Sequence, residues 1–350
     1  ISHLSFSEAP TPKLPNSQMD PNYQASLKSA ETEDWVDLHI IRPFCYQLSK
    51  WFARLDIHPN TVTIASMFVG AGSAFFFAQG CYYYEGWCGL VCNLIAILML
   101  MVADIFDCTD GQLARMTGKK SRMGRILDGL AGFTWAVPIY CALTYRFYVH
   151  HDIEFSWIGL ADTQQNALIA TAVVFVLALI SGFVGQAGQQ RLADYYIQVH
   201  LFFMKGEKGS ELDNSVRQQE IYDTMPADAK WIERAFQKSY IDYTRQQEKS
   251  TPQFQRLMRV LRQRYGSSDQ IPQEIRDEFR RESLPLIKWN GLLTFNFRTA
   301  WLFLFCLLDV PVLNFLFEII AMSILACYVN RRHERFSRRM ADQVEATHQA

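Results

Sequence analysis

The sequence lacks an excess of charge of either sign, and this excludes two classes of protein. Its 350 residues include 34 Lys and Arg and 35 Asp and Glu, a formal net charge of -1. A general nucleic-acid-binding protein would normally be basic. An acidic disordered protein would have few apolar residues, whereas 49% of this chain is hydrophobic. The chain is therefore expected to fold and to bind no nucleic acid.

Two other patterns are missing. The chain does not open with basic residues followed by an apolar stretch, so its start is not expected to be a secretory signal. The eight cysteines include no CxxC pair. Cys81 and Cys88 flank a short loop, where they either form a disulfide or, as we favour, are ordinary apolar residues.

Aromatic residues, in contrast, are abundant, with 25 Phe, 15 Tyr and 8 Trp. Such a content is typical of chains that meet lipid interfaces. The mean hydropathy of -0.04 is that of a soluble protein, but the apolar residues are concentrated in six runs. Each run approaches the ~20 residues that a helix needs to cross the hydrocarbon of a bilayer. We therefore predict an all-α integral membrane protein with six transmembrane helices, at residues 60–79, 87–103, 126–148, 167–184, 292–308 and 310–329.

The runs divide the chain into four parts. Residues 1–34 are polar and are expected to form a mobile extension. Residues 35–204 contain the first four spans, preceded by a juxtamembrane amphipathic helix that Pro43 bends or splits. Residues 205–288 are expected to be a cytosolic helical insertion between spans four and five. Residues 289–350 contain spans five and six and a basic tail.

Local signals support a helix within the insertion. Thr251 is a candidate N-cap, Pro252 suits a first helical position, and Gly266 suits a C-terminal stop.

The distribution of Lys and Arg orients the predicted helices. The connections at 80–86, 150–166 and 309–311 contain neither residue, whereas 115–125 and 331–339 are rich in them. Positive residues remain on the cytosolic side of membranes. Both termini are therefore expected to face the cytosol.

Carboxylates gather where the second run ends and the third begins. Asp104, Asp107 and Asp110 are three residues apart, which places each about one turn further along nearly the same helix face, and Asp128 follows. One carboxylate could merely solvate a helix end, but several at a membrane edge are costly and indicate function. They repel one another unless a divalent cation neutralises them. Oxygen ligands favour Mg²⁺, Mn²⁺ or Ca²⁺ over zinc.

Small and basic residues accompany the carboxylates. Gly111, Ala114 and Gly124 are small where a substrate must approach the backbone closely. Arg115 and the cluster at 119–125 place positive charge nearby, as a diphosphate would require. These features together predict a metal-bound nucleoside diphosphate at the membrane surface.

This pattern resembles the signature of the CDP-alcohol phosphotransferase family, D-x2-D-G-x2-A-R-x8-G-x3-D-x3-D. Residues 58–63, His-Pro-Asn-Thr-Val-Thr, are similar to the Pro-Asn-x-x-Thr that opens the first span in the family. The resemblance covers about residues 40–200 and does not include the insertion. It also implies six spans, cytosolic termini and a homodimer. Seven of the eight fixed signature positions match, namely Asp107, Asp110, Gly111, Ala114, Arg115, Gly124 and Asp128.

The resemblance implies a reaction in phospholipid synthesis. A phosphatidyl or phospho-alcohol group would pass from a CDP-linked donor to an alcohol acceptor, with release of CMP. The enzyme would lie in a bacterial inner membrane or an endomembrane, with its active site facing the cytosol. Two divalent ions, Mg²⁺ or Mn²⁺, would be held by Asp107, Asp110 and Asp128. The nucleotide would be lined by Gly111, Ala114, Arg115 and Gly124.

The acceptor is less clearly indicated. Arg191 and Arg298 are candidates to hold its phosphate or headgroup, and an inositol-phosphate-like acceptor would suit them. Arg191 is alternatively a cytosolic anchor, and Arg298 alternatively the partner of a buried carboxylate. A transporter is disfavoured, since the polar residues of the runs gather at one membrane edge rather than at the midplane.

The eighth signature position departs from the family. The last Asp, usually assigned as general base and metal ligand, is replaced here by Gly132. Three interpretations remain. In the first, Asp104 supplies the base or the missing ligand, so that Asp104 and Asp128 are the catalytic carboxylates. In the second, the acceptor is activated by metal alone or by a carboxylate from elsewhere. In the third, the chain binds nucleotide or lipid without transferase activity.

Overall fold

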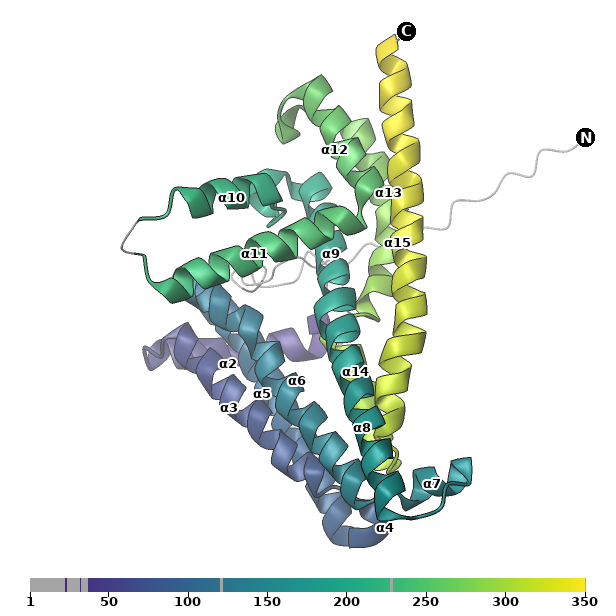
Figure 1. The fold of residues 1–350 in the computed structure, drawn as a ribbon. Helices are drawn as coiled ribbons and strands as arrows, with labels where there is room; N and C mark the ends of the chain where they lie inside the picture. Colours follow the sequence, from purple (N-terminus) through teal and green to yellow (C-terminus); the bar gives the residue numbers. More distant parts are fainter. Residues whose placement is uncertain (1–22, 24–31, 33–36, 120–121, 227–228, 350) are drawn as a thin grey trace, which may run out of the picture.

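The computed structural model describes residues 37–119, 122–226 and 229–349, together with Tyr23 and Thr32. Within these ranges every regular element is a helix (Figure 1). The prediction of an all-α protein is therefore confirmed. Apart from Tyr23 and Thr32, the predicted extension over residues 1–34 lies outside the described residues.

Long helices form the first part of the chain, preceded by a short π-helix, η1, and by α2. Pro43 stands in the first turn of α2, and η1 runs directly into α2, with Ile41 in the right-handed helical region. The juxtamembrane segment is therefore not split at Pro43, but it changes from a π-helix to an α-helix at Arg42. The elements are η1 (Asp37–Ile41), α2 (Arg42–Arg54), α3 (Pro59–Ala78), α4 (Tyr82–Glu85), α5 (Trp87–Thr117), α6 (Arg122–Val149), α7 (Asp152–Ile158), α8 (Gln164–Ser181), η2 (Gly182–Gln189, also π) and α9 (Gln190–Lys205).

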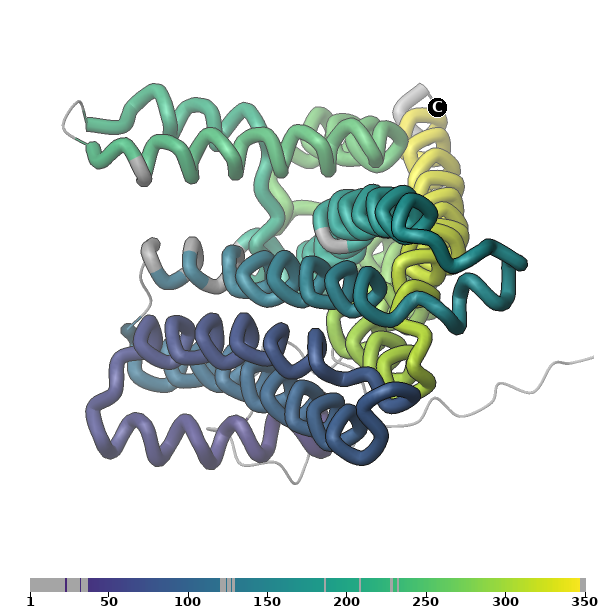
Figure 2. Tube along the Cα trace, turned by 60° about the horizontal axis from the view of Figure 1, so that its bottom comes forward, coloured from purple at the N-terminus to yellow at the C-terminus, as the bar shows by residue number. Residues whose placement is uncertain are grey.

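Shorter helices follow, before α14 and α15 return to the bundle. In Figure 2, α10 and α11 lie side by side at one edge of the molecule, and α2 lies at the opposite edge. Helix α12 starts at Pro252 and stops before Gly266, which has a φ of 73°, so both predicted signals are confirmed. The elements are η3 (Glu207–Gly209), α10 (Ser215–Asp223), α11 (Trp231–Ser250), α12 (Pro252–Tyr265), η4 (Ser268–Gln270), α13 (Gln273–Gly291), α14 (Phe295–Leu307) and α15 (Val312–Gln349).

Four helices in the described ranges are long and apolar enough to cross a membrane. They are α3, α5, the continuous helix α8–η2–α9 and α15. They correspond to the first, second, fourth and sixth predicted spans. Helix α14 has only 13 residues, about 20 Å of rise. The third and fifth predicted spans are helical, in α6 and α14, but within the described residues they are not among these four helices.

Helices α3 and α6 pack closely where the Trp135 ring of α6 meets Gly70 of α3. A Cβ added at Gly70 would lie 2.2 Å from the ring of Trp135, so only glycine lets this indole reach α3. The indole N–H then donates to the carbonyl of Ser66 at 3.0 Å. Trp135 also packs against Phe295 of α14, with ring centroids 5.4 Å apart.

A second apolar core lies at the other end of the long helices, between α9, α12, α13 and α15. Stacked and edge-on rings of Phe203, Phe279 and Phe336 occupy its centre. Glu334 of α15 accepts hydrogen bonds from the backbone N–H groups of Gln253 and Phe254, at 2.7 and 3.2 Å. This carboxylate therefore caps α12 in place of the expected Thr251.

Thr251 occupies the predicted N-cap position, but its side chain makes no capping bond. Its hydroxyl donates instead to the carbonyl of Gln247, at 2.9 Å. The threonine thus completes the end of α11 while Glu334 satisfies the start of α12.

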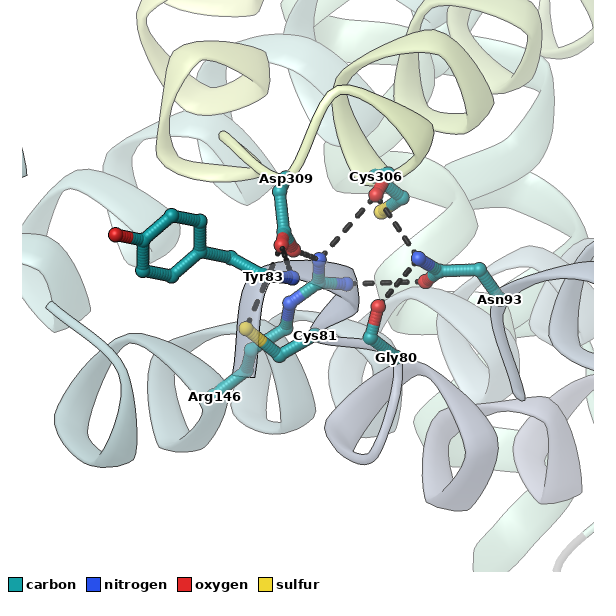
Figure 3. A network of polar contacts seen from close by, with 7 residues as sticks. All are labelled: Gly80, Cys81, Tyr83, Asn93, Arg146, Cys306 and Asp309. Carbon is teal, nitrogen blue, oxygen red and sulfur yellow. Dashed lines mark hydrogen bonds and ion pairs between the residues drawn. The ribbon is translucent and has the colours of Figure 1, made fainter. Parts of the chain in front are cut away.

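A buried polar network joins the helices at the end opposite the motif (Figure 3). Arg146 of α6 pairs with Asp309 in the turn between α14 and α15, and their side chains are 2% and 8% exposed. Arg146 also donates to Asn93 of α5, at 3.0 Å, and to the carbonyl of Cys306, at 3.2 Å. Asp309 accepts from the backbone N–H of Tyr83, at 2.6 Å. The network therefore links α4, α5, α6 and the α14–α15 turn.

Cysteines near this network are not cross-linked. Cys81 is buried and Cys88 is exposed, and both are free thiols. The Cys81 thiol lies 3.5 Å from the Asp309 carboxylate. The favoured interpretation, in which these residues form no disulfide, is confirmed.

We expect Arg146→Met to lower the free energy of unfolding by about 3–5 kcal/mol, because it leaves the Asp309 carboxylate buried without its cation. Asp309→Asn should cost a similar amount, and the double variant less than the sum. Chemical unfolding of the purified protein in detergent measures all three. Additive losses would show that the two side chains are not coupled. Asp162→Asn, at an exposed carboxylate, is the control.

Candidate active site

Three of the predicted carboxylates, Asp104, Asp107 and Asp110, stand on one uninterrupted helix, since α5 continues past the predicted span to Thr117. At 3.6 residues per turn, Asp107 and Asp110 point about 60° apart around the axis, whereas Asp104 and Asp110 point about 120° apart. Asp107 and Asp110 therefore share a face of α5. Asp104 is turned toward the neighbouring face.

Asp110 is held by α3. The carboxylate is 5% exposed, and its Oδ2 accepts a hydrogen bond from the hydroxyl of Thr63, itself 3% exposed. Thr63 reaches this place because α3 begins just before it. Pro59 occupies the first turn of α3, and the N-cap His58 accepts from the N–H of Asn60 at 3.2 Å. The His-Pro-Asn segment thus sets the start of α3 so that Thr63 faces α5.

Asp104 has different surroundings. Two nearby charges act on it, namely the like charge of Asp37 in η1 and the opposite charge of Arg42 in α2. Asp37 in turn accepts from the amide of Asn296 in α14, at 2.8 Å. Asp104 therefore faces the juxtamembrane helices rather than α3.

The same juxtamembrane helix holds the backbone of the motif. Ser49 of α2 donates to the carbonyl of Thr109, at 3.1 Å, and Cys45 to that of Ile105, at 3.5 Å. Ser49, Thr109 and Cys45 are completely buried. The motif segment of α5 is thus enclosed between α2 and α3.

Arg115 folds back along α5 over Gly111. A Cβ at Gly111 would lie 3.4 Å from Nη1 of Arg115. The absence of a side chain at 111 therefore lets the guanidinium approach the helix backbone beside Asp110. Ala114 is half-buried on the same helix.

Two loops meet at the motif end of the bundle. Lys119, after α5, pairs with Asp56, before α3, at 2.6 Å. The hydrogen bond and charge of Lys119 lower the pKa of the Asp56 carboxyl. Lys119, predicted to lie beside the diphosphate, is thus engaged by a surface carboxylate.

The remaining signature positions lie on α6. Gly124 is half-buried in its first turn, and the backbone of Asp128 lies in its second turn. The side chain of Asp128 lies outside the described residues. Among the described residues, a Cβ added at Gly132 would meet no atom within 4 Å.

Arg191 and Arg298 are widely different in burial. Arg191, at the start of α9, is half-buried and interacts electrostatically with Tyr243 of α11. Its carbonyl accepts from Gln247, also of α11, at 3.3 Å. Arg298 of α14 is 2% exposed and lies inside the bundle.

Arg298 takes part in a polar network that the sequence analysis missed. Its Nη1 lies 3.8 Å from the Glu318 carboxylate of α15, and its Nη2 donates to Gln189 of η2. The hydroxyls of Tyr140 and Ser181 both donate to Glu318. Arg298 is thus paired with a buried carboxylate, as one of its two interpretations expected. The signal was available, because Glu318 is the only acidic residue in the run 310–329.

This network borders a cavity of about 20 Å³, enough for one water molecule. In the described part of the chain, Nη1 of Arg298 and both amide atoms of Asn314 line it without a hydrogen bond. Arg298 lies about 16 Å along the helix axis from the Asp309 turn. Arg298, Glu318 and Asn314 therefore form a second group of buried polar residues within the predicted runs, apart from the motif.

The donor set suits a hard divalent cation, although the described residues contain no group of three His, Cys, Asp or Glu placed to hold one. The third predicted ligand, Asp128, has its side chain outside those residues. Asp107 and Asp110 share a helix face, and Oδ1 of Asp107 is buried. Carboxylate oxygens are the ligands that Mg²⁺ and Mn²⁺ prefer. The residues present therefore fit such an ion.

Comparison with protein families assigns a class to this site. The family model described as CDP-alcohol phosphatidyltransferase matches residues 56–181, from the turn before α3 to the last residue of α8. This segment is about a third of the chain and contains the whole motif. The resemblance is confirmed over residues 56–181, which match the model of a CDP-alcohol phosphatidyltransferase domain. Comparisons with curated proteins and with solved structures gave no match.

We expect Thr63→Val to weaken Mn²⁺ binding by about 10–100-fold, because it removes the hydrogen bond that orients the Asp110 carboxylate. Electron paramagnetic resonance of Mn²⁺ titrations measures the affinity directly. Thr61→Val, at an exposed position on the same helix, is the matched control. Equal affinities in the two variants would contradict an orienting role for Thr63.

Proposed function

We propose that the protein is an integral membrane transferase that moves a phosphatidyl or phospho-alcohol group from a CDP-linked donor to an alcohol. CMP is the leaving product, and the reaction belongs to phospholipid synthesis. The observation that carries the proposal is the pair Asp107 and Asp110 on one face of α5, with Asp110 bonded to Thr63. This pair lies within the segment that matches the transferase family.

The proposal assigns Asp107, Asp110 and Asp128 as the residues that would hold two divalent ions, Mg²⁺ or Mn²⁺. Bound there, such ions offset charge on the diphosphate and on the attacking and leaving oxygens. The chain itself supplies orientation. Thr63 restricts rotation of the Asp110 carboxylate, as outer partners of metal ligands commonly do.

The nucleotide side of the site is assigned to Gly111, Ala114, Arg115 and Gly124. Arg115 already lies against the backbone at Gly111. From there its planar guanidinium would pair with two oxygens of the diphosphate. An acceptor hydroxyl would then attack the phosphorus that carries the lipid or alcohol, and positioning of the two substrates would supply much of the rate.

The proposal includes the topology. Helix α6 packs against α3 and α8, and α14 packs against α5 and α15. These contacts support placing α6 and α14 in the bilayer with the other four predicted spans. Residues 205–288 would be a cytosolic insertion, and the termini and active site would face the cytosol of a bacterial inner membrane or an endomembrane. The homodimer remains an expectation of the family.

The acceptor is proposed to be a polyol phosphate of the inositol-phosphate type. Arg191 is the better supported contact, because it lies at the motif end of the bundle and is half-exposed. Arg298 remains a candidate, but its guanidinium is already paired with Glu318.

The most direct test is to supply the purified protein with CDP-diacylglycerol, a panel of polyols and polyol phosphates, and Mg²⁺ or Mn²⁺. Mass spectrometry of the lipid products identifies the acceptor, and release of CMP reports turnover. Asp107→Ala should abolish CMP release, whereas Asp162→Ala, at the opposite end, should not change it. Binding of CDP-diacylglycerol without CMP from any acceptor would instead establish the alternative, a family member that has lost transferase activity.

Gly132→Asp should raise CMP release by about 10²-fold, within the range expected of a positioned general base. The added side chain has room, because a Cβ at 132 meets no atom of the described residues within 4 Å. Gly132→Asn, which has the same size and no basic carboxylate, is the control. Equal rates in the two variants would show that a carboxylate at this position does not limit the reaction.

Asp104→Asn should change turnover by only a few-fold, in contrast to the ~10²–10⁴-fold loss expected on removal of a general base. The reason is that Asp104 faces Asp37 and Arg42 rather than the face shared by Asp107 and Asp110. A large loss with unchanged Mn²⁺ affinity would identify Asp104 as the substitute base. Loss of both would make it a metal ligand.

A further inference from the structure

Helix α15 carries a row of arginines where it leaves the bundle. It has 38 residues and extends well beyond the other long helices (Figure 1). Its outward face in this region contains no lysine and five exposed arginines, Arg331, Arg332, Arg335, Arg338 and Arg339.

The acidic residues of the same segment contact α12. Glu334 caps α12. Asp342 and Glu345 are both bound by Arg256 of α12, at 2.8 and 2.5 Å. All three carboxylates are therefore engaged by α12, although the Asp342 side chain is 54% exposed.

Most of these arginines have no carboxylate of their own. Arg339 pairs with Glu282 of α13, at 2.6 Å. Within the described ranges, no ion pair is formed by the other four, which we call the arginine stripe: Arg331, Arg332, Arg335 and Arg338. Arg335 and Arg338 also border a shallow surface hollow of about 400 Å³, which Arg339 and Asp342 line as well.

The position of the stripe along α15 coincides with the expected edge of the bilayer. Residues 312–329 rise about 27 Å, close to the ~30 Å thickness of bilayer hydrocarbon. At the end of this stretch Tyr328 meets Trp289 of α13 edge-on, with centroids 6.1 Å apart, and the two side chains are 45% and 46% exposed. Exposed Trp and Tyr mark the membrane–water interface. The stripe begins one turn beyond them, in the headgroup layer.

We propose that the arginine stripe binds the headgroups of anionic phospholipids. Arginine presents a planar fork that matches phosphate oxygens, and it gives up hydration more readily than lysine. Basic clusters directly beyond a membrane span attract anionic lipid by about 1 kcal/mol per residue. The lipid supplies the anions that the protein does not. This inference is independent of the proposed function, because lipid binding requires no phosphotransfer.

Native mass spectrometry of the full chain in detergent tests the proposal. Equimolar phosphatidylglycerol and phosphatidylcholine with identical acyl chains are added, and the ratio of bound lipids is read. Changing all four arginines of the stripe to glutamine should reduce the preference for phosphatidylglycerol at least about tenfold. The pair Arg331→Gln and Arg335→Gln should give an intermediate loss.

A control variant replaces four exposed arginines of α11, α12 and α13 with glutamine, namely Arg245, Arg259, Arg262 and Arg281. It should keep the preference for phosphatidylglycerol. An unchanged preference in the four-glutamine variant would overturn the proposal, and so would an equal loss in the control. Thermal unfolding of each variant verifies that the chain is folded during the measurement.

Discussion

The ion pair between Arg146 and Asp309 is the contact on which the arrangement of the long helices depends. Neither charge is tolerated alone in a medium that excludes water, so the two must remain together. They lie on α6 and on the α14–α15 turn, and Asn93 adds α5 to the same point. The family domain and the C-terminal helices are thereby joined at the end far from the motif.

The candidate site follows the same physical rule with a different outcome. Asp110 is at least as buried as Asp309, and its carboxylate accepts a hydrogen bond from the neutral hydroxyl of Thr63. That hydroxyl orients the carboxylate without adding a charge of its own. Arg298 and Glu318 show the contrasting arrangement in the interior, where a guanidinium and a carboxylate neutralise each other.

Features that depend on nearby residues could be predicted from the sequence. Long apolar runs predict helices, and a proline or a glycine marks where a helix begins or ends, as Pro43 and Gly266 do here. Contacts between distant residues could not be predicted in this way: nothing near Thr251 shows that Glu334 will cap α12. The spacing of the motif was also only partly informative, because a repeat of three drifts by about 60° per step and carries Asp104 away from Asp110. Likewise, the predicted span covers residues 292–308, yet α14 begins only at Phe295.

Helix α15 has a mechanical consequence for the protein. It is continuous from Val312 to Gln349, so Glu318 and Arg335 stand about 25 Å apart on a single stiff rod. A torque applied by lipids at Arg335 would turn Glu318 by nearly the same angle. Such a rotation would strain the Arg298 pair and the π-helix η2 that contacts it. The composition of the surrounding leaflet would then act on the interior of the bundle through the twist of one helix.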